Sequence, residues 1–200
     1  NQRGDKKVID YLNAENSYRD LYMKDYKGLE EELFQEIKSR IKEDDSSVPY
    51  LDNGYYYYTR YEKGKQYPIY CRKKGNLEAD EEILIDVNLM SEGYEYFRVG
   101  DIEISPDDKI MAYSVDTLSR RIYTIHFMDL KTREVHKSNI KNTSGSITWA
   151  NDNKTVFYNI RNAETLRSEK VMKHKLNSSS KDKEVYFEED ETFSVYSYKT

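Results

Sequence analysis

A polar turn followed by a strand-like apolar run occurs three times in this chain of 200 residues. The copies read LDNGYYYYTRYE, ISPDDKIMAYSVDT and WANDNKTVFYNIRN, and their turns align at Asp52, Asp107 and Asp152. The spacings between the turns are therefore 55 and 45 residues. A single four-stranded sheet cannot bury both of its faces, whereas stacked sheets cover one another. A repeat of this length with short strands predicts the blades of a β-propeller.

Strand-like segments follow the three turns in a common order. We predict strands at residues 55–61, 67–73 and 83–87, then at 110–115, 123–128 and near Val135, and finally at 156–160, 169–176 and 185–188. Gly64 lies in the first hairpin loop, where a positive φ is often required. Short connections without long helices indicate antiparallel meanders rather than βαβ units. The predicted fold class is mainly β, with about three four-stranded antiparallel blades after N-terminal helices.

The first 44 residues have a helical period instead. An apolar stripe recurs there at helical spacing, formed by Leu29, Leu33, Phe34, Ile37 and Ile41. We expect an i,i+4 ion pair between Glu36 and Arg40, a break between two helices at residues 25–28, and an end to the second helix at about residues 43–47, ahead of Pro49. The chain thus divides into a helical arm at residues 1–44 and blades at residues 45–200.

Composition limits the classes of partner. The net charge is −5 with both signs interspersed, so the sequence favours neither a nucleic-acid-binding face nor a polybasic lipid-binding segment. No apolar run approaches membrane-spanning length. The one cysteine, Cys71, excludes an internal disulfide and fits a reducing compartment, so we expect a cytoplasmic protein.

No motif in the sequence predicts a catalytic, metal or cofactor site. The three histidines, His126, His136 and His174, lack a metal-binding pattern, and His126 and His174 occupy comparable places in successive repeats. SGSITW, which starts at Ser144, lacks the second glycine of a nucleophile elbow. Phosphate-binding and dinucleotide-binding fingerprints are also missing from the sequence. We therefore predict no catalytic residue, metal ligand or cofactor in this chain.

Longer segments carry a family resemblance. They are DYLNAENSY from Asp10, IKEDDSSVPYLDNGYYYYTRYEKGKQYPIYCRKKG from Ile41, SPDDKIMAYSVDTLSRRIYTIHFMDL from Ser105, NTSGSITWANDNKTVFY from Asn142 and TLRSEKVMKHKL from Thr165. Together they resemble the prolyl oligopeptidase family, and within it the oligopeptidase B branch, also called protease II. The resemblance runs from about residue 7 to residue 200 in the order of the family.

The resemblance implies a serine-type peptidase of two domains. A seven-bladed propeller caps an α/β-hydrolase domain with a Ser-Asp-His triad, and the oligopeptidase B branch cleaves short peptides after Lys or Arg while folded proteins are excluded. This chain matches the N-terminal helices and the first three blades, so no triad residue is carried over. We therefore expect the chain alone to be inactive as a peptidase, and to self-associate through the uncovered third blade.

The resemblance also suggests interdomain contacts. The apolar stripe, in particular Leu33, Phe34 and Ile37, is expected to dock on the hydrolase domain, which is the partner implied for this chain. Asp116, Arg120 and Arg121, in the VDTLSRR loop, are expected near a blade rim, in interdomain ion pairs. Two other functions stay open: a non-catalytic propeller scaffold that binds a protein, and a sugar- or peptide-binding surface domain of an envelope protein.

Overall fold

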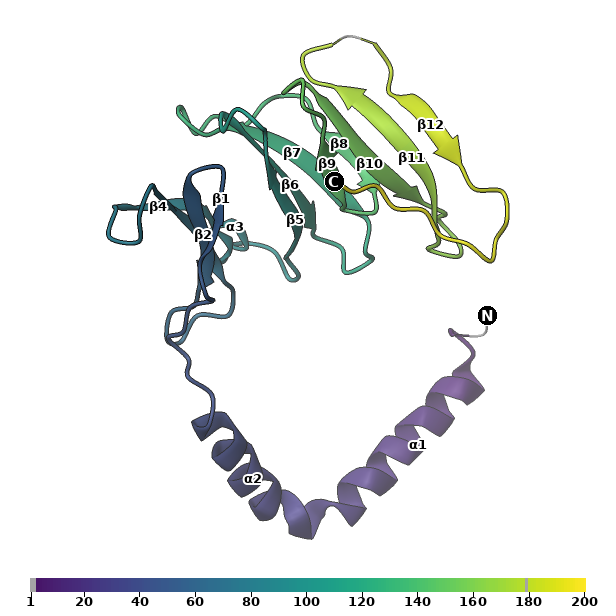
Figure 1. Cartoon of the computed structure of the whole chain (residues 1–200). Coiled ribbons are helices and arrows are strands. Elements are labelled where there is room, and N and C mark those ends of the chain that lie inside the picture. The colour runs from purple at the N-terminus through teal and green to yellow at the C-terminus, as the bar shows by residue number, and fades with distance from the viewer. Residues whose placement is uncertain (1–2, 179) are drawn as a thin grey trace. The chain divides into compact units, whose positions relative to one another are not determined.

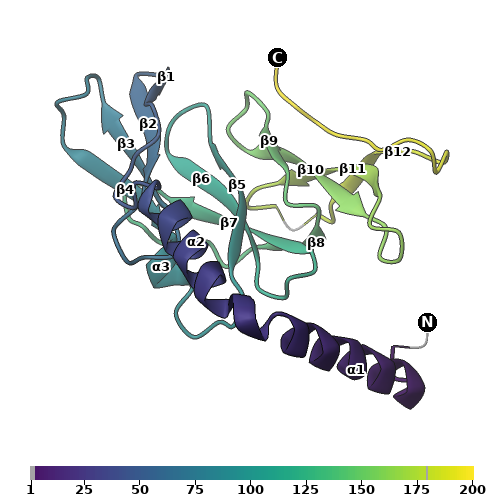
Figure 2. The same cartoon turned by 90° about the horizontal axis from the view of Figure 1, so that it is seen from below.

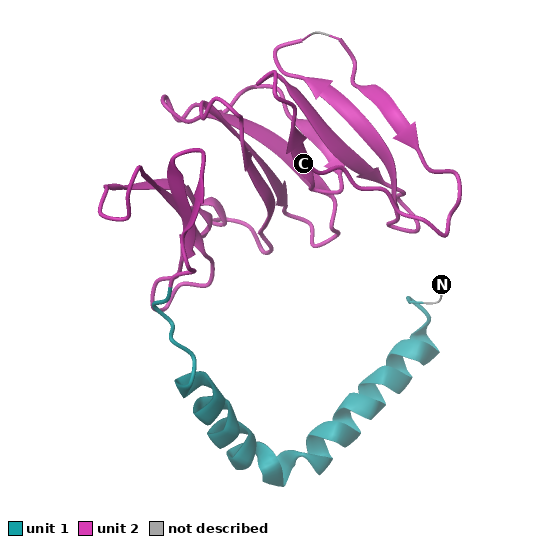
Figure 3. Ribbon diagram, viewed as in Figure 1, with its two compact units in different colours: residues 1–45 teal, residues 46–200 magenta. Residues whose placement is uncertain are grey.

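The computed structural model describes residues 3–178 and 180–200 (Figures 1 and 2). The chain forms two compact units, residues 1–45 and residues 46–200 (Figure 3). Helices make up the first unit, and the second is built mainly of strands. Among the described residues, no helix is both long and apolar enough to span a membrane.

The first unit contains two helices joined by a single 3-10 turn. Helix α1 spans Lys6–Tyr22, the turn spans Lys24–Tyr26, and α2 spans Lys27–Ser39. The 3-10 turn overlaps the predicted break at residues 25–28, although Gly28 itself belongs to the first turn of α2.

Helix α2 ends earlier than the predicted residues 43–47. The Ser39 hydroxyl donates to the Glu36 carbonyl at 2.8 Å, and the Arg40 N–H bonds to the Ile37 carbonyl at 3.2 Å. These i→i+3 bonds tighten the last turn, and the serine hydroxyl competes for a helix carbonyl, so the helix stops. The predicted ion pair between Glu36 and Arg40 is confirmed.

Residues 46–178 and 180–200 form three four-stranded antiparallel sheets. The first sheet contains β1 (Tyr50–Asp52), β2 (Tyr55–Arg60), β3 (Ile69–Lys74) and β4 (Glu81–Asp86). The second contains β5 (Arg98–Ile104), β6 (Ile110–Asp116), β7 (Tyr123–Asp129) and β8 (Ile140–Thr143). The third contains β9 (Ile147–Trp149), β10 (Thr155–Arg161), β11 (Ser168–Lys175) and β12 (Lys183–Phe187). Both cartoon views place the second sheet between the other two, which confirms the predicted stack of blades.

The aligned turns share one backbone geometry. Asn53, Asp108 and Asn153, the middle residues of the three turns, have φ angles of 43°, 58° and 59°. Asn and Asp tolerate this left-handed region better than most residues, because their short side chains bond locally. The Asn53 side-chain amide also donates to the Pro106 carbonyl at 3.2 Å and to Asp108, so the first turn contacts the second. Gly64 has the predicted positive φ, 77°.

Two apolar clusters hold the sheets together. Between the first and second sheets, Leu84, Val87 and Phe97 pack with Met111 and Tyr113. Between the second and third, the buried side chains are Ala112, Ile125, Phe127, Ile140, Ile147, Trp149, Val156, Tyr158 and Leu176. The rings of Phe127 and Trp149 meet edge to face, with centroids 6.0 Å apart. Burying one such large side chain contributes about 1.5–3 kcal/mol, so these faces stabilise the stack.

The structure corrects several strand predictions. The last strand of the second sheet is β8 rather than a segment near Val135, which forms only an isolated bridge with Met128. The first strands β1, β5 and β9 were not among the predicted segments. Helix α3 (Val87–Met90) was also unforeseen, and it begins where the Asp86 carboxylate accepts the Asn88 N–H at 2.9 Å. Pairing with neighbouring strands, rather than local pattern, defines these short elements.

Candidate functional site

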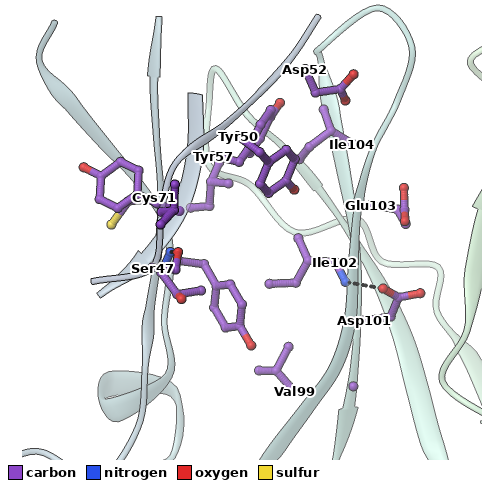
Figure 4. A pocket seen from close by; sticks show the side chains of 16 residues that line it. Ser47, Tyr50, Asp52, Tyr57, Cys71, Val99, Asp101, Ile102, Glu103 and Ile104 are labelled. Atoms are coloured by element: carbon purple, nitrogen blue, oxygen red, sulfur yellow. Dashed lines mark hydrogen bonds between the residues drawn. The ribbon is translucent and has the colours of Figure 1, made fainter. Parts of the chain in front are cut away.

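Cavities open along the first strands of the sheets. One, of about 650 Å³, lies between the first sheet and β5 and is shown in Figure 4. Tyr50 and Tyr57 line one side of it, and Val99 and Ile102 point into it from β5. The Tyr50 and Tyr57 rings stack on each other with centroids 5.6 Å apart. This cavity therefore has an aromatic and aliphatic wall.

A second cavity, of about 830 Å³, lies beside the first. The turn after β1, strands β5 and β9, and residues 197–200 line it. Asp101 and Glu103 point to the side of β5 opposite Ile102 (Figure 4), and both also line this second cavity. We call the four carboxylates that line it, Asp52, Asp101, Glu103 and Asp108, the acidic edge.

Burial and mutual repulsion act on the acidic edge. Glu103 is exposed at the cavity rim, yet partial burial of its carboxylate raises its pKa to about 7; the charges of Asp101 and Asp52 add to that rise, and Lys199, which lines the same cavity, opposes it. Burial likewise raises the pKa of Asp101, against the effect of backbone N–H bonds from Ile147 and Ile102, each 3.0 Å long. Close carboxylates that cannot all ionise freely favour a bound cation or a proton.

Strand contacts fix this geometry. The Ile147 N–H that Asp101 accepts belongs to β9, and the Trp149 indole N–H donates to the Glu103 carbonyl at 3.1 Å. Both bonds cross from the third sheet to the second. The acidic edge is therefore positioned by sheet stacking rather than by any one strand.

The acidic edge has the chemistry of a cation-attracting surface. No group of three or more His, Cys, Asp or Glu side chains within residues 3–178 and 180–200 is arranged to hold a metal ion. Carboxylates at the rim of a cavity do, however, raise the local concentration of positively charged ligands. A Lys or Arg side chain of a peptide fits this description.

A separate polar network lies on the third sheet. His174 Nδ1 lies 2.7 Å from Asp182, and the other oxygen of that carboxylate accepts the Tyr158 hydroxyl at 2.7 Å. The His174 ring stacks on Phe127, while His126 stacks on Tyr113. In the strand register His174 lies opposite Val156 and His126 opposite Tyr113, so the two histidines are not at equivalent repeat positions. Within the described residues no serine bonds to His174, so its pairing with Asp182 does not form a triad.

The predicted interdomain residues occupy different environments. Leu33, Phe34 and Ile37 lie on α2 and are largely exposed. Asp116 is buried, and its carboxylate accepts N–H groups from Leu118, Arg120 and Arg121 at 2.7–3.0 Å. The Asp116 carboxylate therefore stabilises the loop that follows it. Arg120 and Arg121 have exposed side chains on the same loop.

The acidic edge was missed by sequence reasoning. Its members come from two turns and from β5, and Asp52 lies about 50 residues before the other three. Asp101 and Glu103 alternate with Val99, Ile102 and Ile104, and this alternation was the one local signal available. Gly100 and a bulge between Val99 and Ile102 interrupt it.

Stacked antiparallel sheets of four strands define the second unit as part of a β-propeller. A family model described as "Prolyl oligopeptidase, N-terminal beta-propeller domain" matches residues 1–200. The chain belongs to this family, and the resemblance drawn from its sequence is confirmed.

Relatives extend the match over almost the whole chain. Dipeptidyl aminopeptidase BI of Pseudoxanthomonas mexicana is 40% identical, over 96% of this chain and 29% of that protein. Protease 2 of Moraxella lacunata is 30% identical, over 97% of this chain and 29% of that protein. The structure of oligopeptidase B from Leishmania major superposes with a TM-score of 0.84 at 36% identity, over 97% of this chain and 28% of that one. The chain thus spans less than a third of the length of these relatives.

Proposed function

We propose that this chain is the N-terminal propeller part of a serine peptidase of the oligopeptidase B type. The observation that carries the proposal is the similarity to the Leishmania major oligopeptidase B, with a TM-score of 0.84 and 36% identity. The complete protein hydrolyses short peptides after Lys or Arg. Its propeller covers the active site and keeps folded proteins out, and the α/β-hydrolase domain of the same protein is the partner of this chain.

The acidic edge supports the preference for basic peptides. Peptides that carry Lys or Arg are attracted to carboxylates at a cavity rim, and less so in high salt. The attraction acts on the encounter with substrate, whereas selection at the cleaved bond requires charge-assisted bonds in the catalytic domain.

Matched peptides test this proposal. The full-length protein is given blocked fluorogenic peptides that differ only in Arg, Lys, Pro or Phe before the cleaved bond. We expect kcat/KM to be highest for Arg and Lys, and a folded protein with exposed lysines to stay intact. A preference for Pro would place the protein in another branch of the family, and no cleavage at all would favour a non-catalytic scaffold.

A second activity is favoured by a specific observation. The relative from Pseudoxanthomonas mexicana, at 40% identity, is called a dipeptidyl aminopeptidase. Such an enzyme needs a free amino end on its substrate, whereas an oligopeptidase accepts a blocked one. Comparing one Arg peptide with its amino end free or acetylated separates the two: equal cleavage supports the oligopeptidase, and loss of cleavage on acetylation supports the dipeptidyl activity.

A further inference from the structure

A small pocket on the second unit gathers arginines from distant parts of the sequence. It has a volume of about 340 Å³ and is lined by Arg98 at the start of β5, Arg121 in the loop after β6, and Arg161 at the end of β10. The remaining lining is Gly100, Asp101, Tyr123 and residues 144–146. Three positive charges from three elements thus share one pocket.

These guanidinium groups differ from other arginines of the chain. Arg60, Arg72 and Arg167 each form an ion pair with a glutamate. Across residues 3–178 and 180–200, no carboxylate forms an ion pair with any of the three pocket arginines. Their one side-chain hydrogen bond runs from Arg161 Nη1 to the Arg121 carbonyl at 3.3 Å.

Asp101, the one carboxylate in the pocket lining, does not neutralise the three arginines. Asp101 accepts N–H groups from Ile102 and Ile147, which occupy one oxygen each, and it lies beyond ion-pair distance of the arginines. Burial raises the pKa of Asp101, and it is backbone N–H groups that oppose the rise. The pocket therefore keeps its positive charge.

Tyr123 gives the pocket a rigid wall. Its ring lies between Gly100 and Gly145, where an added Cβ would come within 2.6 Å and 2.8 Å of ring atoms. Burial raises the pKa of Tyr123; the charges of Arg98 and Arg161 oppose that rise, and those of Asp116 and Tyr96 add to it. In the described part of the chain the Tyr123 hydroxyl and the Ser146 hydroxyl make no hydrogen bond, so both are free to donate.

Arginine side chains that line one pocket, with hydroxyl donors beside them and no ion-paired carboxylate, favour an anion. Arginine binds planar carboxylates through two parallel N–H bonds, and each such charge-assisted bond is stronger than a neutral one. The anions that a peptidase meets in its substrates and within its own chain are carboxylates. We propose that the pocket of Arg98, Arg121 and Arg161 binds a carboxylate of a peptide chain.

Two sources supply such a group. One is the C-terminal carboxylate of a bound peptide, and this case rests on the proposed function. The other is an Asp or Glu side chain from another part of the complete protein. In both cases the arginines make the same contacts. The two sources are therefore distinguished by whether loss of an arginine changes the preference among peptides or the melting temperature of the protein.

The test uses the full-length protein with Arg98→Gln and Arg161→Gln variants. Lys137→Gln is the control, because it removes the same charge from an exposed side chain of the second unit that does not line the pocket. Each protein is given one blocked Arg peptide that ends in a free carboxylate or in a carboxamide, and its melting temperature is measured at low salt and at high salt.

If the pocket binds substrate, the wild type prefers the free carboxylate, and each pocket variant loses about tenfold of that preference in kcat/KM, while the control keeps it. If the pocket binds the protein's own side chain, the wild type shows no preference, and the pocket variants melt earlier at low salt by a margin that high salt reduces.

Pocket variants that match the Lys137→Gln control in both measurements would overturn the proposal. Failure to cleave either peptide would instead refute the proposed function. The melting temperatures alone would then test carboxylate binding by the pocket, and pocket variants with an unchanged melting temperature would count against it.

Discussion

The helical unit and the sheet unit achieve order in different ways. In α1 and α2, as in the 3-10 turn between them, every residue is solvent-exposed. In the sheet unit Met111, Ala112, Ile125, Phe127 and Val156 are fully buried. Isolated helices of this length are marginal in water, because most helical stability comes from packing of an apolar face. The sheets therefore carry their own stability, whereas the helices require cover for the stripe on α2.

The same contrast separates the roles of similar residues. Phe127 and Phe34 are both large aromatic side chains, yet the first is fully buried and the second is 56% exposed. Burial, rather than residue type, decides what each contributes to folding. Matched substitutions in the two units therefore test the difference between them.

Phe127→Ala should have the largest effect. Removing a buried Phe leaves a cavity between the second and third sheets and costs about 3–5 kcal/mol. Phe34→Ala, the exposed control, should change the free energy of unfolding of the sheet unit by less than about 0.5 kcal/mol. Urea unfolding followed by Trp149 fluorescence measures both, since Trp149 lies in the same core as Phe127. Equal losses in the two variants would show that the units do not differ as described.

Asp116→Ala should have the second largest effect on stability. The buried carboxylate accepts three backbone N–H groups, and its loss leaves them without an acceptor at a cost of about 2 kcal/mol. Asp152→Ala is the control, because Asp152 makes similar turn bonds at an exposed site and should cost about 1 kcal/mol or less. Chemical denaturation of the two variants gives the comparison, and a neutral Asp116→Ala would contradict the structural role of that loop.

Glu103→Gln should change how stability depends on pH. The folded-state pKa of Glu103 is raised from 4.5 to about 7, so its stabilising contribution is complete below pH 4.5 and is lost as the pH rises through 7. The free energy of unfolding of the variant should therefore match that of the wild type at pH 4.5 and exceed it at pH 8 by about 1 kcal/mol, after discounting for solvent screening. Thermal unfolding between pH 4.5 and pH 8 tests this prediction, and a variant that is less stable than the wild type at pH 8 would contradict it.

Ile37→Ser should have the smallest effect in this chain. Its side chain is exposed, so the melting temperature of the sheet unit should not change. In the full-length protein we expect an earlier transition, because the proposal has the α2 stripe docked on the hydrolase domain. Lys38→Ser on the same helix is the control in both backgrounds. An Ile37→Ser protein that melts like the Lys38→Ser protein at full length would remove the docking role.

The repeat allowed much of the sheet unit to be predicted. The segments at 110–115 and 156–160 fall within β6 and β10, because these strands are long, apolar and preceded by a recognisable turn. β9 was missed because it has three residues, and β5 because a glycine and two acidic residues interrupt its pattern. Such strands are defined by their neighbours, which a local pattern does not contain.

The candidate sites were less accessible to sequence reasoning. Arg121 was singled out from its loop. Arg98, 23 residues away, joins it through the pairing of β5 with β6, and Arg161, 40 residues away, joins it only when the sheets stack. The acidic edge depends on the same stacking. Charges on one sheet edge look like ordinary solvated residues until the fold places them around a cavity.

The order in which one mixed peptide is cut distinguishes the proposed activity from its alternatives. A single peptide with a free amino end and with internal Arg, Pro and Phe is incubated with the full-length protein, and the products are identified by mass spectrometry. We predict that the first products result from cleavage after Arg, whatever the distance of Arg from the amino end. First products that end at Pro, or that begin with release of an N-terminal dipeptide, would contradict it.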